Sequence, residues 1–536
     1  MLQPFDPFVS ERLPDPAASP HLLFDLAGLD YPDRFNAAVE LLDRAVAEGE
    51  GSRLAVVNDE GQWTYGELKR LSDRIAQLLI EDGGLIPGNR VLLRGPNSYT
   101  LIASWFAVLK AGGIVVTTMP MLRAGELAPI LAKARISHAI IDARCLQDWR
   151  QAADKAPDLR WTATYDGDAG TGALEALAAT RSGDFAAHLG RGTDPALIAF
   201  TSGTTGTPKG CIHDHRALLA PADTFARHIL RPEPGLRWCG SPPIAFTFGL
   251  GALVLFPFRF RGTSVTLESG TPANLLEAIG RHKVNLLFTA PTAYKVMLGA
   301  LDGADLSSLR TCVSAGEHLP PAVLEAWRGA TGHTLVNGIG ATEMMHIFIS
   351  AAGADVVPGA TGRVVPGYRA CVLDENGAPL SEGVGRLAVQ GPTGCRYLDD
   401  PRQATYVQNG WNVTGDTYRL DADGYFHFVA RSDDMIVSSG YNIAAPEVEN
   451  ALLSHEAVAE CAVVGAPDAA RGMIVKAYVV CASGAGDEAL ARCLQDHVKA
   501  TIAPYKYPRA VEFVPALPKT LTGKVQRFRL REERVS

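Results

Sequence analysis

Short runs of β-branched and apolar residues alternate with amphipathic stretches along most of this chain, and this alternation limits the possible folds more than any other feature. The runs include NRVLLRG, GGIVVTTM, SHAIIDA and VNLLFTAP, and the stretches include TYGELKRLSDRIAQLLIEDG and TPANLLEAIGRHK. Such a pattern favours mostly parallel sheets that are covered by helices. We therefore predict an α/β fold made of more than one α/β subdomain.

The pattern changes from about Tyr368, where hairpin-like strands with Asn-Gly and Asp-Gly turns begin. This predicts a β-rich subdomain at the end of a large N-terminal domain. A chain of 536 residues exceeds a single compact core, so two or more domains are expected. A smaller α+β unit follows, and we predict domains at 1–431 and 432–536.

The charge and apolar content argue against nucleic-acid and membrane partners. The net charge is −8, which disfavours binding to nucleic acid or to an anionic membrane surface. The most apolar window, Leu101 to Leu122, is interrupted by Lys110 and by Gly112-Gly113. It predicts a buried helix ended by glycine and then a buried strand.

The N-terminal sequence MLQPFDPFVSERLPDP lacks the pattern of a signal peptide. The nine cysteines are scattered without a Cys-x-x-Cys pair, which predicts reduced thiols and gives no zinc signature. We expect a cytoplasmic protein, either a monomer or a homodimer.

The stretch AFTSGTTGTPKGCIHDH, from Ala199 to His215, has the composition of a phosphate-binding loop. It follows a buried strand and combines glycines, hydroxyl side chains and Lys209. A polar surface turn is the alternative. The spacing does not fit a Walker A motif, and Glu343 in NGIGATE replaces the third glycine of a dinucleotide-binding motif.

Five motifs in a fixed order resemble the adenylate-forming acyl-activating enzymes. They are TSGTTGTPKG, GATE, TGD at 414–416, GYFHFVARSDDMIVSSGYNIAAPEVE and PKTLTGK. The segments FNAAVELLD, SAGEHLP and NGIGATEMMHIF are most similar to benzoate-type aryl-CoA ligases, including 2-aminobenzoate-CoA ligases. The resemblance implies a large N-terminal domain that binds AMP and the acyl group, and a small mobile C-terminal domain.

The resemblance also implies a two-step reaction. ATP and a carboxylic acid form an acyl-adenylate with release of pyrophosphate, and the thiol of CoA then accepts the acyl group. Magnesium is the implied cofactor, with Glu343 as its ligand and Thr342 as a phosphate contact. The implied ATP and AMP contacts are Thr201, Ser202, Gly203, Thr204, Thr205, Gly206, Lys209, Ser314, Ala315, Gly316, Glu317, Asn337, Gly338, Ile339, Gly340, Asp416 and Arg431. Ile339 departs from the family, many members of which carry an aromatic residue there.

Lys524 matches the lysine that serves the carboxylate and the α-phosphate during adenylation. Lys519, in the same basic segment, is interpreted as a solvated side chain. Asp433 matches a hinge residue, and Gly440 matches a glycine beside the path of the CoA arm. The cysteines are interpreted as packing residues, since the adenylate is itself the activated acyl donor.

The predicted acyl pocket is small, flat and mostly apolar, which suits a planar ring. Its residues are Phe246, Thr247, Phe248, Gly249 and His346, with Ala315, Gly316 and Ile339 nearby. The absence of an acidic residue there argues against an α-amino acid. Thr247 and His346, which is predicted on the rim, could bind a ring substituent. Together with the resemblance to 2-aminobenzoate-CoA ligases, they imply 2-aminobenzoate as the acid, followed by benzoate or a hydroxybenzoate. A backbone-bonded Thr247 hydroxyl is the alternative.

Two other functions stay open at this point. An aryl-acid adenylase would load a carrier protein in place of CoA. A regulatory protein could keep the fold and nucleotide binding without catalysis, but the presence of Glu343, Asp416 and Lys524 together disfavours it.

Overall fold

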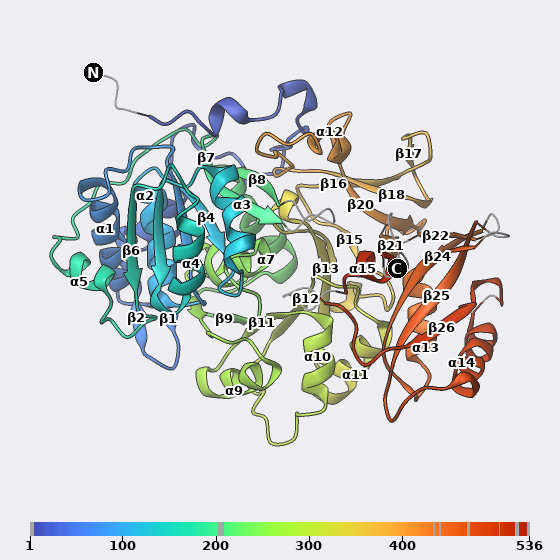
Figure 1. Cartoon of the computed structure of the whole chain (residues 1–536). Coiled ribbons are helices and arrows are strands. Elements are labelled where there is room, and N and C mark those ends of the chain that lie inside the picture. The colour runs from blue at the N-terminus through green and yellow to red at the C-terminus, as the bar shows by residue number, and fades with distance from the viewer. Residues whose placement is uncertain are drawn as a thin grey trace. The chain divides into compact units, whose positions relative to one another are not determined.

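The structure is a computed structural model that describes residues 5–201, 208–431, 435–438, 441–468, 472–502, 504–519 and 525–532. The chain divides into two compact units. The first unit holds residues 1–370 and 389–412, and the second holds 371–388 and 413–536. Figure 1 shows the helices and strands of both units.

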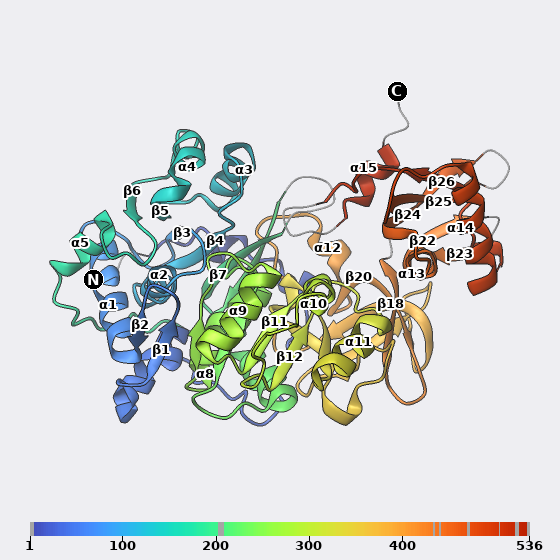
Figure 2. The same ribbon diagram turned by 90° about the horizontal axis from the view of Figure 1, so that it is seen from below.

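The first unit contains two large sheets, as the alternating sequence pattern predicts. In spatial order the first sheet has β6 (Trp161–Tyr165), β5 (His138–Asp142), β3 (Arg90–Arg94), β4 (Ile114–Thr118), β7 (Pro195–Thr201) and β8 (Lys209–Asp214). Its strands run parallel except for the antiparallel pair β7 and β8. Figure 2 shows α3 (Ala124–Ala134) and α4 (Leu146–Ala153) on one side of this sheet and α1 (Tyr65–Glu81) and α2 (Tyr99–Lys110) on the other.

The second sheet is parallel in its centre and antiparallel at both ends. In spatial order it has β15 (Arg363–Val364), β14 (Ile347–Ala351), β13 (Leu335–Gly340), β12 (Thr311–Ser314), β11 (Leu286–Thr289), β9 (Arg237–Gly240), β10 (Thr263–Val265), β1 (Leu54–Val57) and β2 (Gln62–Thr64). Apolar side chains of α9 (Pro272–His282), α10 (Pro291–Leu298) and α11 (Pro321–Thr331) form one core with its strands. The other α-helices in the described part of the unit are α5 (Ala173–Ala179), α6 (His215–Pro221), α7 (Thr247–Leu250), α8 (Phe256–Arg259) and α12 (Gln403–Tyr406).

The apolar window at 101–122 forms a buried helix and a buried strand, as predicted. Ser98 caps α2 by accepting a hydrogen bond from the Leu101 amide, and every residue of α2 is buried. Gly112, at a φ of 81°, follows the helix before β4 begins. Within the described residues, no helix is long and apolar enough to cross a membrane.

The hairpins of the β-rich region lie where the turn sequences predict them. The strands are β16 (Arg369–Leu373), β17 (Pro379–Leu380), β18 (Gly383–Gln390), β19 (Val407–Gln408), β20 (Trp411–Leu420) and β21 (Phe426–Arg431). Gly377 and Gly424 take positive φ angles in the Asn-Gly and Asp-Gly turns. The division between the two units falls within β16, β18 and β20, and the predicted boundary at 431/432 stays a prediction.

The rest of the second unit is an α+β fold with its own core. Its strands are β22 (Met435–Ser438), β23 (Tyr441–Ala444), β24 (Val458–Asp468), β25 (Gly472–Cys481) and β26 (Ala510–Phe513). Its helices are α13 (Ala445–Leu453), α14 (Glu488–Thr501) and α15 (Arg527–Glu532). Side chains of α13 and α14 pack on β24 and β25, so the predicted combination of α/β subdomains, β-rich strands and a small α+β domain is confirmed.

A buried ion cluster fixes the C-terminal end of α2. The Lys110 ammonium lies 2.5 Å from the Asp43 carboxylate and 2.7 Å from that of Asp73 on α1. It also donates to the Ser72 hydroxyl at 2.9 Å. Burial raises the pKa of Asp43, against the opposing effect of the Lys110 charge. The cluster joins α1 and α2, and Lys69 on α1 adds a second ion pair to Asp73 at 2.6 Å.

Replacing Lys110 by methionine should therefore lower the free energy of unfolding of the first unit by about 3–5 kcal/mol, because two carboxylates lose a buried partner. Urea unfolding followed by tryptophan fluorescence measures the change. Lys295→Met, on an exposed part of α10, is the matched control and should change it by less than about 0.5 kcal/mol. Equal midpoints for both variants would show that the cluster contributes nothing to stability.

Candidate active site

The strands that flank the predicted phosphate-binding loop form a tight antiparallel hairpin in the first unit. Thr201 at the end of β7 is the cross-strand partner of Lys209 at the start of β8. The predicted contacts Ser202, Gly203, Thr204, Thr205 and Gly206 lie outside the described residues. The described part therefore brings both ends of the loop together.

Lys209, Tyr397 and Glu343 form a compact polar group next to the loop. Lys209 Nζ donates to the Tyr397 hydroxyl at 2.8 Å, and this hydroxyl donates to Glu343 Oε1 at 2.5 Å. The Lys209 ammonium lies 3.5 Å from the same carboxylate oxygen. Burial, together with the Glu343 charge, raises the pKa of Tyr397, so the phenol stays protonated. Sequence analysis did not identify Tyr397, which belongs to none of the motifs used there.

Thr342 and Glu343 lie in a short 3₁₀ turn, Thr342–Met344, directly after β13. His213 on β8 is hydrogen-bonded through Nε2 to the Thr342 carbonyl at 2.8 Å. Met345 follows at a φ of 64° and a ψ of −39°, and the His346 amide donates to the Met344 carbonyl at 2.7 Å. This is a strained positive-φ γ-turn, and it sharply reverses the chain beside Glu343.

The predicted adenine contacts lie at the carboxyl ends of neighbouring parallel strands. Ser314 at the end of β12 is the cross-strand partner of Asn337 on β13. Gly316 follows at a φ of 89°, and Glu317 accepts hydrogen bonds at 3.4 Å from Thr292. The remaining predicted contacts at these strand ends are Ala315, Gly338, Ile339 and Gly340. Ligands of open α/β sheets bind at this edge, so the placement suits a nucleotide.

Gly338 and Gly340 allow close pairing of β13 and β14. A Cβ at Gly338 would lie 2.8 Å from the Ile347 side chain, and one at Gly340 would lie 2.7 Å from the His346 carbonyl. At Gly340 a larger residue would collide with the backbone of β14 and its approach, whereas at Gly338 it would displace the Ile347 side chain. The two glycines therefore serve the geometry of the hairpin.

His346 is buried among aromatic rings, and its position corrects one detail of the sequence analysis. Its side chain does not lie on an exposed rim: the residue is 2% exposed. Its ring lies 5.5 Å from Phe225, 5.5 Å from Phe248 and 4.6 Å from Phe256 between centroids. His346 is distant in the sequence from all three phenylalanines, so no local pattern could show that they meet.

The His346 ring is neutral and retains hydrogen-bonding capacity. Burial lowers the pKa of His346 to about 3 and outweighs the opposing effect of the Phe248 backbone. Among the described residues, neither ring nitrogen has a hydrogen-bond partner of normal geometry. Gly251 makes room for the ring, since a Cβ there would lie 2.4 Å from His346 Cδ2. Sequence analysis missed this glycine.

The other predicted acyl-pocket residues are on or next to α7. Thr247 begins this helix and is 7% exposed, while Phe246 and Phe248 on either side of it are half-buried. A Cβ at Gly249 would lie 2.1 Å from the Pro243 carbonyl, so only glycine allows this tight approach. The predicted acyl-pocket segment therefore starts a short helix whose backbone packs closely on the preceding loop.

The predicted ribose contacts are paired in the second unit. Asp416 on β20 and Arg431 on β21 are cross-strand partners, and Arg431 donates to the Asp416 carboxylate at 3.2 Å. Asp433, Gly440 and Lys524 lie outside the described residues. No disulfide joins any of the nine cysteines, and the described residues contain no metal-binding group of three or more His, Cys, Asp or Glu side chains.

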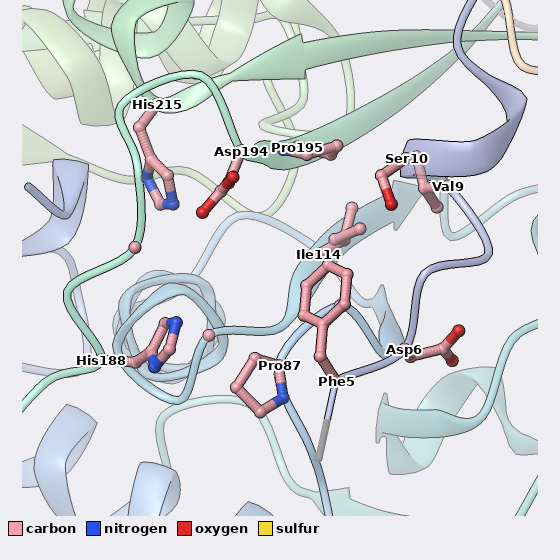
Figure 3. Close-up of a pocket in the computed structure, with 13 residues that line it drawn as sticks. Phe5, Asp6, Val9, Ser10, Pro87, Ile114, His188, Asp194, Pro195 and His215 are labelled. Carbon is pink, nitrogen blue, oxygen red and sulfur yellow. The ribbon is translucent and has the colours of Figure 1, made fainter. Parts of the chain in front are cut away.

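A small cavity beside the N-terminal segment contains none of the predicted site residues. Figure 3 shows Phe5, Pro87, His188, Asp194 and His215 around it. Its volume is about 20 Å³, which is enough for a water molecule and too small for a nucleotide or an aromatic acid.

The family models match both parts of the chain. Residues 42–396 match the AMP-binding enzyme family, and residues 447–524 match the AMP-binding enzyme C-terminal domain. The first match alone covers more than half of the 536 residues.

The chain is similar to CoA ligases over nearly its whole length and theirs. The benzoate–CoA ligase of Thauera aromatica is 37% identical, with 94% of this chain and 97% of the relative covered. The 4-hydroxybenzoate–CoA/benzoate–CoA ligase of Rhodopseudomonas palustris is 34% identical, with 93% of this chain and 94% of the relative covered.

A solved structure of the anthranilate CoA ligase AuaEII in complex with anthranoyl-AMP has a TM-score of 0.89 and 32% identity, covering 95% of this chain and 99% of that one. The benzoate CoA ligase from Burkholderia xenovorans LB400 has a TM-score of 0.83 and 31% identity, covering 93% and 100%. The chain therefore belongs to the AMP-binding enzyme family, and the predicted similarity to the aryl-CoA ligases of the adenylate-forming superfamily is confirmed.

Proposed function

We propose that this enzyme converts a small aromatic carboxylic acid to its CoA thioester at the expense of ATP. A carboxylate oxygen attacks the α-phosphorus and pyrophosphate leaves, which gives an aryl-adenylate. The thiol of CoA then attacks the acyl carbon, loses its proton, and releases AMP. The observation that carries this proposal is the pairing of Lys209 and Glu343 beside the phosphate-binding hairpin, in a chain of this family.

The predicted nucleotide contacts, Lys524 and the hinge have separate roles in the proposed reaction. The loop and Lys209 hold the β- and γ-phosphates, which leave as pyrophosphate. Asn337 and its neighbours face adenine, while Asp416 and Arg431 bind the ribose. Lys524 stabilises the charge that develops at the α-phosphate, and the 432–536 domain turns about Asp433 between the two steps.

Glu343 and the nucleotide phosphates suit Mg²⁺, which typically takes one or two carboxylates, phosphate oxygens and water. Within the described residues, the hydrogen bond from Tyr397 and the ion pair with Lys209 both use Oε1 of Glu343, so Oε2 is available to a cation. A bound Mg²⁺ would neutralise charge on the phosphates. Thr342, next to Glu343, would contact the same phosphates.

The aromatic box around His346 favours 2-aminobenzoate as the acid, with benzoate or a hydroxybenzoate next. A neutral imidazole offers one donor and one acceptor nitrogen, which can bind an amino or hydroxyl substituent on a flat ring. The names of the similar ligases, for anthranilate, benzoate and 4-hydroxybenzoate, support the same class of acid. A cytoplasmic location and a monomeric or homodimeric state remain predictions.

Pyrophosphate release with Mg·ATP over a panel of aromatic acids tests the proposed activity. We expect the highest kcat/KM with 2-aminobenzoate, and a CoA-dependent thioester as the product. A chain that releases no pyrophosphate with any aromatic acid would contradict the proposal. Supplying a phosphopantetheinylated carrier protein in place of CoA distinguishes a CoA ligase from a carrier-loading adenylase.

His346→Leu should reduce the preference for 2-aminobenzoate over benzoate, measured as the ratio of the two kcat/KM values, by about tenfold, because a lost hydrogen bond is worth about 1 kcal/mol or more. Phe248→Leu, which changes the same box without removing a polar atom, is the control and should affect both acids similarly. An unchanged ratio in His346→Leu would mean that this ring does not recognise the substituent.

Lys524→Ala should slow adenylate formation by about 10²–10³-fold, because a cation at the developing charge is lost, while sparing thioester formation from a supplied aryl-adenylate. Single-turnover assays of the two half-reactions measure this separation. Lys519→Ala, in the same segment, is the control and should leave both rates within about twofold. Equal loss of both half-reactions in Lys524→Ala would contradict the assigned role.

A further inference from the structure

We infer that Tyr397 is a positioning residue for nucleotide binding: its hydroxyl keeps the Glu343 carboxylate and the Lys209 ammonium in separate roles. The inference rests on the proposed function, in which Glu343 holds a cation and Lys209 holds phosphate. Tyr397 matches no motif identified in the sequence, and its role follows from its contacts alone.

The direction of the two hydrogen bonds is determined by chemistry. An ammonium group can only donate, and an ionised carboxylate can only accept. The Tyr397 hydroxyl has a single proton, so it accepts from Lys209 Nζ at 2.8 Å and donates to Glu343 Oε1 at 2.5 Å. Tyr397 is 1% exposed and Glu343 is 7% exposed, so water cannot easily replace these bonds.

The backbone around Tyr397 is held at several points, so the phenol is presented rigidly. The Ile212 amide donates to the Arg396 carbonyl at 2.7 Å, and the Leu398 amide donates to the Gly210 carbonyl at 2.8 Å. These bonds extend the β8 edge with an antiparallel bridge between Cys211 and Tyr397. A side chain on such a frame keeps its geometry without reorganisation.

Additional side-chain contacts fix the same segment. The Tyr397 amide donates to Gln403 Oε1 at 2.9 Å, and Gln403 Nε2 donates to the Cys395 carbonyl at 3.0 Å. Arg396 forms an ion pair with Asp214 on β8 at 3.1 Å. Burial by itself would raise the pKa of Asp214, but the charges of Arg396 and Arg216 lower it, so this ion pair is retained.

The distances predict what happens when the hydroxyl is removed. Lys209 Nζ already lies 3.5 Å from Glu343 Oε1 with the phenol oxygen bound to both. Without that oxygen, the Lys209 ammonium is stabilised by moving closer to the Glu343 carboxylate, because a buried charge needs a partner. A closed ion pair would compete with the cation for Glu343 and would draw Lys209 away from the phosphates.

Tyr397→Phe in the full chain tests this inference. We expect the Mg²⁺ concentration that gives half-maximal pyrophosphate release to rise about tenfold, with the rate largely restored at high Mg²⁺ and the KM for the acid unchanged. Electron paramagnetic resonance of Mn²⁺ with α,β-methylene-ATP, which cannot be cleaved at the α,β position, should show about tenfold weaker Mn²⁺ binding without turnover.

Tyr294→Phe is the matched control. Its hydroxyl is also buried and donates to the carbonyls of Leu287 and Val313 in the α10 core, so its removal affects packing without touching Glu343 or Lys209. Mn²⁺ binding should then match that of the unmodified enzyme. A purely structural role for Tyr397 would instead lower the rate equally at every Mg²⁺ concentration.

A double-mutant cycle with Glu343→Gln gives a second test. Because Tyr397 acts through Glu343, Tyr397→Phe should weaken Mn²⁺ binding no further in the Glu343→Gln background. Additive losses, or Mn²⁺ binding by Tyr397→Phe equal to that of the unmodified enzyme, would overturn the inference. The Mn²⁺ assay needs no acid, so it stays decisive even if pyrophosphate release fails and the proposed function is wrong.

Discussion

The double-sided hydrogen bonding of β8 is the constraint on which the candidate site depends. One edge of this strand pairs with β7, and residues 396–398 bond to the other edge. Side chains alternate along a strand, so Lys209, Cys211 and His213 share one face. Through that face the hairpin reaches the Tyr397 hydroxyl and the Thr342 carbonyl. A single strand thus places one end of the proposed phosphate-binding loop beside the carboxylate that is proposed to hold the cation.

The turn after β13 carries the other half of this arrangement. The positive φ of Met345 is unfavourable for a residue with a side chain, and the surrounding hydrogen bonds maintain it. The reversal points Glu343 toward Tyr397 while directing His346 into the aromatic box. Two proposed subsites, one for phosphate and cation and one for the acid, are therefore joined by a turn of a few residues. Movement at this turn would disturb both.

Sequence analysis predicted most of the candidate site where motifs are local, and failed where contacts are distant. It identified Lys209, Glu343 and the strand ends at Ser314 and Asn337, since each lies in a short motif after a buried strand. It placed His346 on the rim of the acyl pocket, because the residues near His346 in the sequence do not indicate that the rings of Phe225 and Phe256 surround it. Gly251 was missed for the same reason: its need for a small side chain arises from the nearby His346 ring and from Phe256.

The sequence by itself determined the α/β class, the buried helix and strand within 101–122, the glycine turns of the β-rich strands and the buried strand before the loop of Ser202 to Gly206. Periodicity, capping and turn chemistry act between neighbouring residues, so they can be recognised without a fold. The tertiary structure alone decided that Tyr397 meets Lys209, 188 residues away, and Glu343, 54 residues away. These contacts depend on which distant segments pair with the edge of β8. Many segments could make the same backbone hydrogen bonds, so the packing of the whole unit determines which one pairs there.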